Sequence, residues 1–227
     1  DNVAIPLPAA IGEYAVFGLV AGTTVAVSLV PRDQAGNAGS ALSLDVATRN
    51  PTAEFPPEAV IADPAIDCPQ AYKATPPSAS ILTSADDKNV FVMPNEARSF
   101  RLHLPDSALL SSPRPLLLAL HGTAEDAYAF EQRSNIPVDV TGAGFIVLLP
   151  NSVGHGQVWP VWDAMRQAGH QADANADMAF FDTLLSCVAG HFPVDKRRIY
   201  VGGHSAGGIM TNYVLQQRSD VFAGGIV

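Results

Sequence analysis

Beyond residue 90, short apolar runs alternate with segments whose apolar positions recur at helical spacing. Residues 98–104 alternate between apolar and polar as a half-buried antiparallel strand does, whereas 115–120 are apolar throughout, which is typical of a strand buried on both faces. The alternation of such strands with helices predicts an α/β fold with a mostly parallel sheet covered on both sides. We expect further strands at 145–149, 198–202 and 222–227, and helices at 125–134, 177–188 and 209–218.

The first 49 residues have a different pattern, in which short apolar segments are separated by turns rich in Gly and Asn. This arrangement indicates part of a β-sandwich. Prolines then cluster between residues 50 and 90, which favours a stiff extended linker. An alternative is that part of this segment packs on the following domain through Cys68 and Tyr72. The expected N-terminal strands are 15–17, 24–30 and 41–47, and the expected units are a partial sandwich at 1–49, a linker at 50–90 and an α/β domain at 91–227.

Net charge and the pattern of the longest uncharged stretch argue against two classes of partner, nucleic acids and membranes. Charged residues make up 15% of the chain and its formal net charge is −9. Nucleic acid needs a basic surface, so we expect no nucleic-acid partner. The longest uncharged stretch, 14–31, contains hydroxyl residues and alternates over 25–29, which indicates a strand and no membrane insertion.

The two cysteines, Cys68 and Cys187, lie far apart and match no metal-ligand spacing. They would form one long-range disulfide if the protein is exported. The other interpretation is that Cys187 is a small, buried apolar residue on a helix. The sequence is compatible with both.

Residues 203–207 read Gly-His-Ser-Ala-Gly and lie between an apolar strand and a helical pattern. In this context Gly-x-Ser-x-Gly forms a nucleophile elbow, which lifts the serine hydroxyl above the edge of a parallel sheet. We therefore predict that Ser205 is a nucleophile. A second strand ends at His121, and in such folds the loop at that point and the residue after the nucleophile supply two oxyanion-binding N–H groups. The candidate donors are the backbone N–H groups of Thr123 and Ala206.

Residues 98–227 resemble the secreted esterase family that contains extracellular polyhydroxybutyrate depolymerases, feruloyl esterases and acetylxylan esterases. The most specific part is Val-Asp-Lys-Arg-Arg-Ile-Tyr-Val-Gly-Gly-His-Ser-Ala-Gly-Gly-Ile-Met at 194–210. The resemblance implies an α/β-hydrolase fold and a secreted enzyme that hydrolyses polymeric or oligomeric esters. Residues 18–27 and 32–37 likewise resemble the last strands of a fibronectin type III domain, a module that agrees with such extracellular enzymes. The other matching segments are 98–105, 118–122, 177–181 and 220–223.

A base for Ser205 does not stand in the expected part of the sequence. In this fold the catalytic acid and histidine follow the serine, but no histidine follows Ser205. We expect the side chain of His204 to point away from the elbow, Asp220 to be structural and Asp177 to be a helix N-cap. The chain is therefore expected to be a C-terminally truncated α/β-hydrolase whose catalytic Asp and His lie beyond Val227.

The predicted function is that of a secreted serine ester hydrolase. No metal-ligand pattern, phosphate loop or dinucleotide fingerprint is present, so no metal or cofactor is expected. Trp159 and Trp162 lie where the resembled family often has a tryptophan pair near the substrate cleft, and we predict that they bind substrate by stacking; loop packing is the alternative. A serine peptidase, a general carboxylesterase and a non-catalytic binding protein of the same fold remain the alternative functions.

Overall fold

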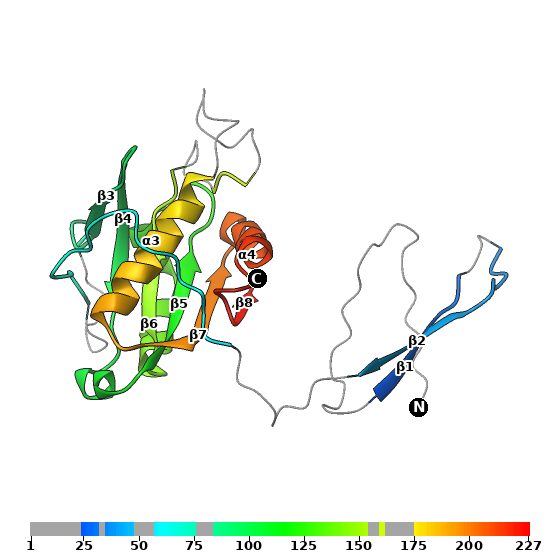
Figure 1. Ribbon diagram of the computed structural model, residues 1–227. Coiled ribbons are helices and arrows are strands. Elements are labelled where there is room, and N and C mark those ends of the chain that lie inside the picture. Colours follow the sequence, from blue (N-terminus) through cyan, green and yellow to red (C-terminus); the bar gives the residue numbers. More distant parts are fainter. Residues whose placement is uncertain (1–23, 32–34, 48–56, 76–83, 154–158, 162–174) are drawn as a thin grey trace. The chain divides into compact units, whose positions relative to one another are not determined.

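The computed structural model describes residues 24–31, 35–47, 57–75, 84–153, 159–161 and 175–227. The chain divides into two compact units, Asp1–Phe55 and Pro56–Val227. The first contains a two-stranded ribbon, and the second a six-stranded sheet with helices packed on it (Figure 1). No helix in the described part of the chain combines the length and the apolarity that a membrane crossing requires.

The N-terminal unit contains one antiparallel hairpin. Strands β1 (Thr24–Leu29) and β2 (Leu42–Ala47) pair with Thr24 opposite Ala47. These strands match two of the three predicted ones, and the third, 15–17, lies outside the described residues. The described residues of this unit form no second sheet, so the partial sandwich and its resemblance to a fibronectin type III domain are not confirmed.

The larger unit is built on a six-stranded sheet in the order β3-β4-β6-β5-β7-β8. Strands β5, β6, β7 and β8 are parallel, and β4 pairs antiparallel with both β6 and β3. The predicted mostly parallel α/β fold is therefore confirmed. The strands are β3 (Asn89–Val92), β4 (Ala97–His103), β5 (Arg114–Leu120), β6 (Ile146–Pro150), β7 (Val194–Gly203) and β8 (Gly224–Ile226).

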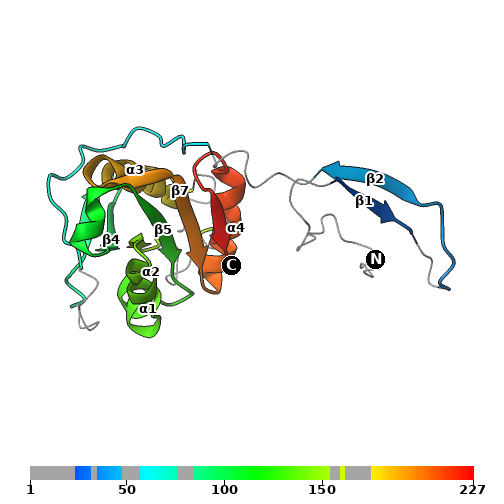
Figure 2. The same cartoon turned by 90° about the horizontal axis from the view of Figure 1, so that it is seen from below.

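Helices cover both faces of this sheet (Figure 2). Along β5, Leu116 and Leu118 belong to the apolar cluster under α3 and α4, while Leu117 and Ala119 belong to the cluster under α1 and α2. Side chains alternate between the faces of a strand, so a strand covered on both sides must be apolar throughout. The helices are η1 (Ser107–Ser111), α1 (Ala127–Arg133), α2 (Ile136–Gly142), α3 (Ala176–His191) and α4 (Ala206–Gln217).

The described part of the proline-rich segment, residues 57–75, packs along the α3 side of the sheet (Figure 2). Backbone hydrogen bonds join Ala59 N to Lys196 O at 2.9 Å and Thr75 N to Leu102 O at 2.9 Å. These contacts support the packing alternative over a free linker for residues 57–75. Apolar side chains from the segment add to the core: Ala59, Ile61, Ile66, Cys68 and Tyr72.

A disulfide joins Cys68 to Cys187 on α3, across a sequence separation of 119. Cys187 is buried, as one interpretation of the sequence expected, but it is not an unpaired apolar residue. That interpretation is wrong because residues 57–75 lie over α3 and bring the two sulfur atoms together.

Candidate active site

Strands β5 and β7 bring two loops together at one edge of the sheet. They are parallel neighbours, and Leu120 stands opposite Gly203 where both strands end. The residues that follow, His121 to Thr123 and His204 to Ala206, therefore emerge side by side. A hydrogen bond of 3.2 Å from His204 N to Leu120 O ties the two strand ends together.

The turn after β7 has the geometry of a nucleophile elbow. Ser205 has φ 56° and ψ −116°, a backbone conformation that costs a non-glycine residue about 1–3 kcal/mol. Gly203 and Gly207 allow this turn, because a Cβ on Gly203 would lie 2.4 Å from the backbone of Gly207 and a Cβ on Gly207 would lie 2.1 Å from Leu120 O. The sequence expectation that small residues surround Ser205 thus follows from backbone contact.

Ser205 stands at the N-cap position of α4, yet its side chain makes no capping hydrogen bond and the residue is exposed. Ser at this position usually accepts a hydrogen bond from the helix backbone. The first N–H groups of α4, starting at Ala206, have no acceptor within the helix, and the helix dipole makes this end favourable for negative charge. An anion that forms beside Ser205 would therefore be stabilised.

The loop after β5 is held by His121, which is buried. Its Nδ1 lies 2.8 Å from Gly122 O, its Nε2 lies 3.2 Å from Ser152 N, and its carbonyl oxygen accepts a 2.7 Å hydrogen bond from Trp159 Nε1. A carbonyl must accept and an amide must donate, so His121 carries its proton on Nδ1 and is neutral. Burial lowers the pKa of His121, which agrees with the neutral form. His121 fixes the loop and does not face Ser205 as a base.

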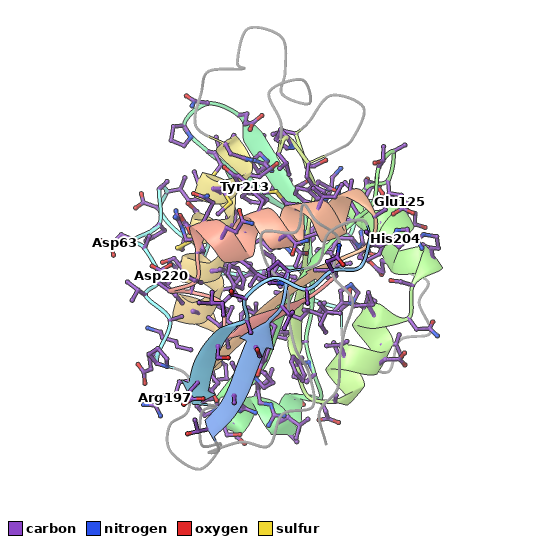
Figure 3. The ribbon with its side chains drawn as sticks, turned by 90° about the vertical axis from the view of Figure 1, so that its right-hand side faces the viewer. Asp63, Glu125, Arg197, His204, Tyr213 and Asp220 are labelled. Carbon is purple, nitrogen blue, oxygen red and sulfur yellow. A yellow bond between two sulfur atoms is a disulfide. The ribbon has the colours of Figure 1, made fainter. Side chains whose placement is uncertain are left out.

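Charged residues link the same loop to the elbow. Glu125 Oε2 accepts a 3.0 Å hydrogen bond from Gly122 N, and Arg133 donates to both carboxylate oxygens, at 2.6 and 3.0 Å. Arg133 Nη2 also lies 3.3 Å from His204 Nδ1. The hydrogen bond from Arg133 holds the pKa of Glu125 below its usual range. Figure 3 shows Glu125 and His204 close to each other at the start of α4.

The structure brings three of the predicted site residues, Ser205, Ala206 and Thr123, to this edge of the sheet. Trp159 is only 1% exposed, and its ring packs in a tilted arrangement against His121 with ring centroids 4.7 Å apart, so it supports the loop. This placement agrees with loop packing and leaves Trp159 little surface for a substrate. Trp162 lies outside the described residues.

Two aspartates considered in the sequence analysis make contacts with residues other than Ser205. Asp220 follows the far end of α4, as Figure 3 shows, and its carbonyl oxygen accepts a hydrogen bond from Val60 N at 3.0 Å. The prediction that Asp177 is an N-cap is wrong, because Asn175 Oδ1 caps α3 and the carboxylate of Asp177 forms a buried ion pair with Arg98. Burial raises the pKa of Asp177 to about 6 despite this arginine.

The described histidines use their rings elsewhere. His204 faces Arg133, His103 lies 3.3 Å from the Glu131 carboxylate, and the ring of His191 packs on Tyr72. The described residues therefore assign no proton acceptor to Ser205.

The cluster of Glu125, Arg133 and His204 was not predicted from the sequence. Its one signal there was a pair of opposite charges eight residues apart, near the ends of a predicted helix.

Comparison with known proteins adds a family match. Residues 98–226, more than half of the chain, match the family model described as Esterase PHB depolymerase. A putative esterase, NocK of Nocardia uniformis subsp. tsuyamanensis, is 30% identical over 59% of this chain and 38% of its own length. Feruloyl esterase B of Neurospora crassa is 27% identical over 54% of this chain and 40% of its own length. The chain thus spans less than half the length of these curated relatives.

A solved structure shares the fold. The substrate-bound fluorophosphonate-binding serine hydrolase FphF of Staphylococcus aureus superposes with a TM-score of 0.50 and 18% identity, covering 61% of this chain and 54% of that one. At this identity the likeness concerns the fold alone.

Proposed function

The chain belongs to the esterase PHB depolymerase family, and from that premise we propose that it hydrolyses carboxylic esters through an acyl-enzyme on Ser205. The observation that carries this proposal is the strained, exposed Ser205, whose hydroxyl is not used to cap α4. Strain of this kind is retained where the surrounding structure enforces it, and it concentrates at active sites.

In the proposed reaction, Ser205 Oγ attacks the ester carbonyl carbon, and the carbonyl oxygen becomes an oxyanion. The backbone N–H groups of Thr123 and Ala206 donate to this oxygen. Collapse of the intermediate releases the alcohol and leaves an ester on Ser205, which water hydrolyses to the carboxylic acid. The proton acceptor is neither His121 nor His204 and stays unassigned among the described residues.

The proposed substrates are polymeric or polymer-derived esters, and the proposed location is extracellular. Support comes from the names of relatives, which include feruloyl esterase B, acetylxylan esterase A and oxidized polyvinyl alcohol hydrolase. The disulfide between Cys68 and Cys187 supports export, because disulfides persist in oxidising compartments. A general carboxylesterase or serine peptidase would share the same nucleophile.

The proposal is tested by treating the full-length protein with a fluorophosphonate probe and locating the label by mass spectrometry. We expect labelling at Ser205, hydrolysis of p-nitrophenyl acetate, and loss of both in Ser205→Ala. The matched control is Ser219→Ala, an exposed serine beyond the other end of α4, which should react normally. Absence of both labelling and ester hydrolysis would favour the alternative function, a non-catalytic binding protein of the same fold.

A further inference from the structure

The oxyanion loop and the nucleophile elbow are joined by Glu125 and Arg133, two residues that the proposed reaction does not use. Glu125 belongs to the loop and accepts the Gly122 N–H at 3.0 Å, one residue before the proposed donor Thr123. Its second carboxylate oxygen accepts a 2.6 Å hydrogen bond from Arg133 Nε. The arginine, at the end of α1, thereby fixes the carboxylate that orients the peptide before Thr123.

Arg133 also reaches the elbow. Its Nη2 lies 3.3 Å from Nδ1 of His204, the residue before Ser205. A guanidinium only donates, so His204 accepts at Nδ1. A Cβ on Gly122 would lie 3.1 Å from Glu125 Oε2 and 3.2 Å from His204 Nδ1, which means that loop, carboxylate and elbow are in close contact.

Arg133 is not arranged as a receptor for an anionic substrate. Two of its nitrogens donate to Glu125, and the carboxylate balances its charge. A planar guanidinium with a two-point contact fixes direction as well as charge, which a lysine does not reproduce. The pair therefore suits a positioning role.

We infer that Glu125 and Arg133 are positioning residues. They hold the Thr123 N–H at a fixed position relative to Ser205, so that the oxyanion donor and the nucleophile act on the same carbonyl group. This inference rests on the proposed esterase activity of Ser205. The carbonyl oxygen is common to all esters and is held most tightly in the transition state, so disruption of the pair should lower kcat, leave KM nearly unchanged and affect different acyl groups equally.

The test compares variants of the full-length protein with p-nitrophenyl acetate and p-nitrophenyl butyrate, and measures the fluorophosphonate labelling rate of Ser205. We expect Arg133→Met to lower kcat for both esters by about 10- to 100-fold, the scale of a misplaced catalytic group. Arg133→Lys should recover part of this loss. Because the two residues act as a unit, Glu125→Gln combined with Arg133→Met should be no slower than Arg133→Met alone.

The matched control is Arg197→Met. Arg197 is 49% exposed and pairs with Glu58 at 3.7 Å, whereas Arg133 is 47% exposed, and Figure 3 places Arg197 far from His204. Arg197→Met should keep the wild-type kcat. If Arg133→Met fails to fold in a thermal melt, Arg133→Lys and Glu125→Gln decide the test by the same kinetics.

Two results would overturn the inference while leaving the proposed function intact. The first is that Arg133 variants keep the wild-type kcat and labelling rate. The second is that the loss of kcat differs between the acetyl and butyryl esters, which would place Arg133 in the acyl pocket. If the wild-type protein itself neither labels nor hydrolyses, the proposed function fails and the inference fails with it.

Discussion

The α-carbon of Gly207 packs directly on the carbonyl oxygen of Leu120, so that a Cβ at position 207 would lie only 2.1 Å from that oxygen. This contact sets how closely helix α4 approaches the end of β5. It therefore determines the separation between the serine at the start of the helix and the loop that follows the strand.

The first prediction concerns this contact. Gly207→Ala should push α4 away from β5, because the Cβ would meet backbone atoms of Leu120 and His121 that have no room to move. We expect the labelling rate of Ser205 to fall at least about 100-fold, as for a displaced catalytic group, together with a lower melting temperature. Gly190→Ala is the control, since a Cβ there meets nothing within 4 Å. Equal reactivity of the two variants would contradict the prediction.

The disulfide should contribute strongly to stability. Closing a loop of 119 residues removes unfolded-state entropy worth about 4–5 kcal/mol in the chain-entropy model. Replacing both Cys68 and Cys187 by alanine should lower the free energy of unfolding by up to that amount in urea titrations. Reductant should destabilise the wild type and leave the variant unchanged. The prediction is wrong if the wild type keeps its free energy of unfolding in reductant although mass spectrometry shows that the disulfide is reduced.

The ion pair of Asp177 and Arg98 should make stability depend on pH. Burial raises the folded-state pKa of Asp177 from 3.8 to about 6, so the folded protein binds this proton more tightly than the unfolded chain. Its contribution to stability is therefore largest below about pH 4 and is lost as the pH rises from about 4 to 6. Urea midpoints measured across this range should fall more steeply with pH for the wild type than for Asp177→Asn. Parallel curves would show that Asp177 does not titrate there.

Trp159 offers a test of what anchors the loop after β5. Trp159→Phe keeps an aromatic ring in the core but removes the donor to His121 O. The buried carbonyl would lose its partner, which costs about 1–3 kcal/mol in unfolding free energy. We also expect a slower reaction at Ser205, because the loop loses one of its anchors. Unchanged guanidinium unfolding and kinetics would show that the indole N–H is dispensable.

Strand β3 was not predicted, but the other described strands and the elbow were predictable because each follows from a local rule. Residues 115–120 are apolar throughout since β5 is covered on both faces, and the glycines around Ser205 are those that a tight turn needs. Helix α2 was not predicted, because Pro137 near its start and Gly142 at its end resemble loop residues. Here Pro137 stands in the first turn, where its missing N–H does no harm.

Features that join distant segments were either left open by the sequence or not predicted from it. The sequence left the pairing of Cys68 with Cys187 open, because the pairing depends on the path of residues 57–75 over α3, which no periodicity encodes. Asp177 resembled an N-cap by its place at a helix start, but its partner Arg98 lies on β4, 79 residues earlier in sequence. The link from Glu125 through Arg133 to His204 likewise joins two strand ends and a helix, so only the folded chain brings it together.

The bond between Cys68 and Cys187 also closes a covalent ring. Strands β3 to β6 and the loop after β5 lie inside this ring, whereas Ser205 lies outside it. A protease that cuts once between the two cysteines opens the ring without releasing a fragment, so the loop after β5 stays tethered to the part of the chain that carries Ser205. Such a nicked molecule would migrate as one species until reductant separates its two halves.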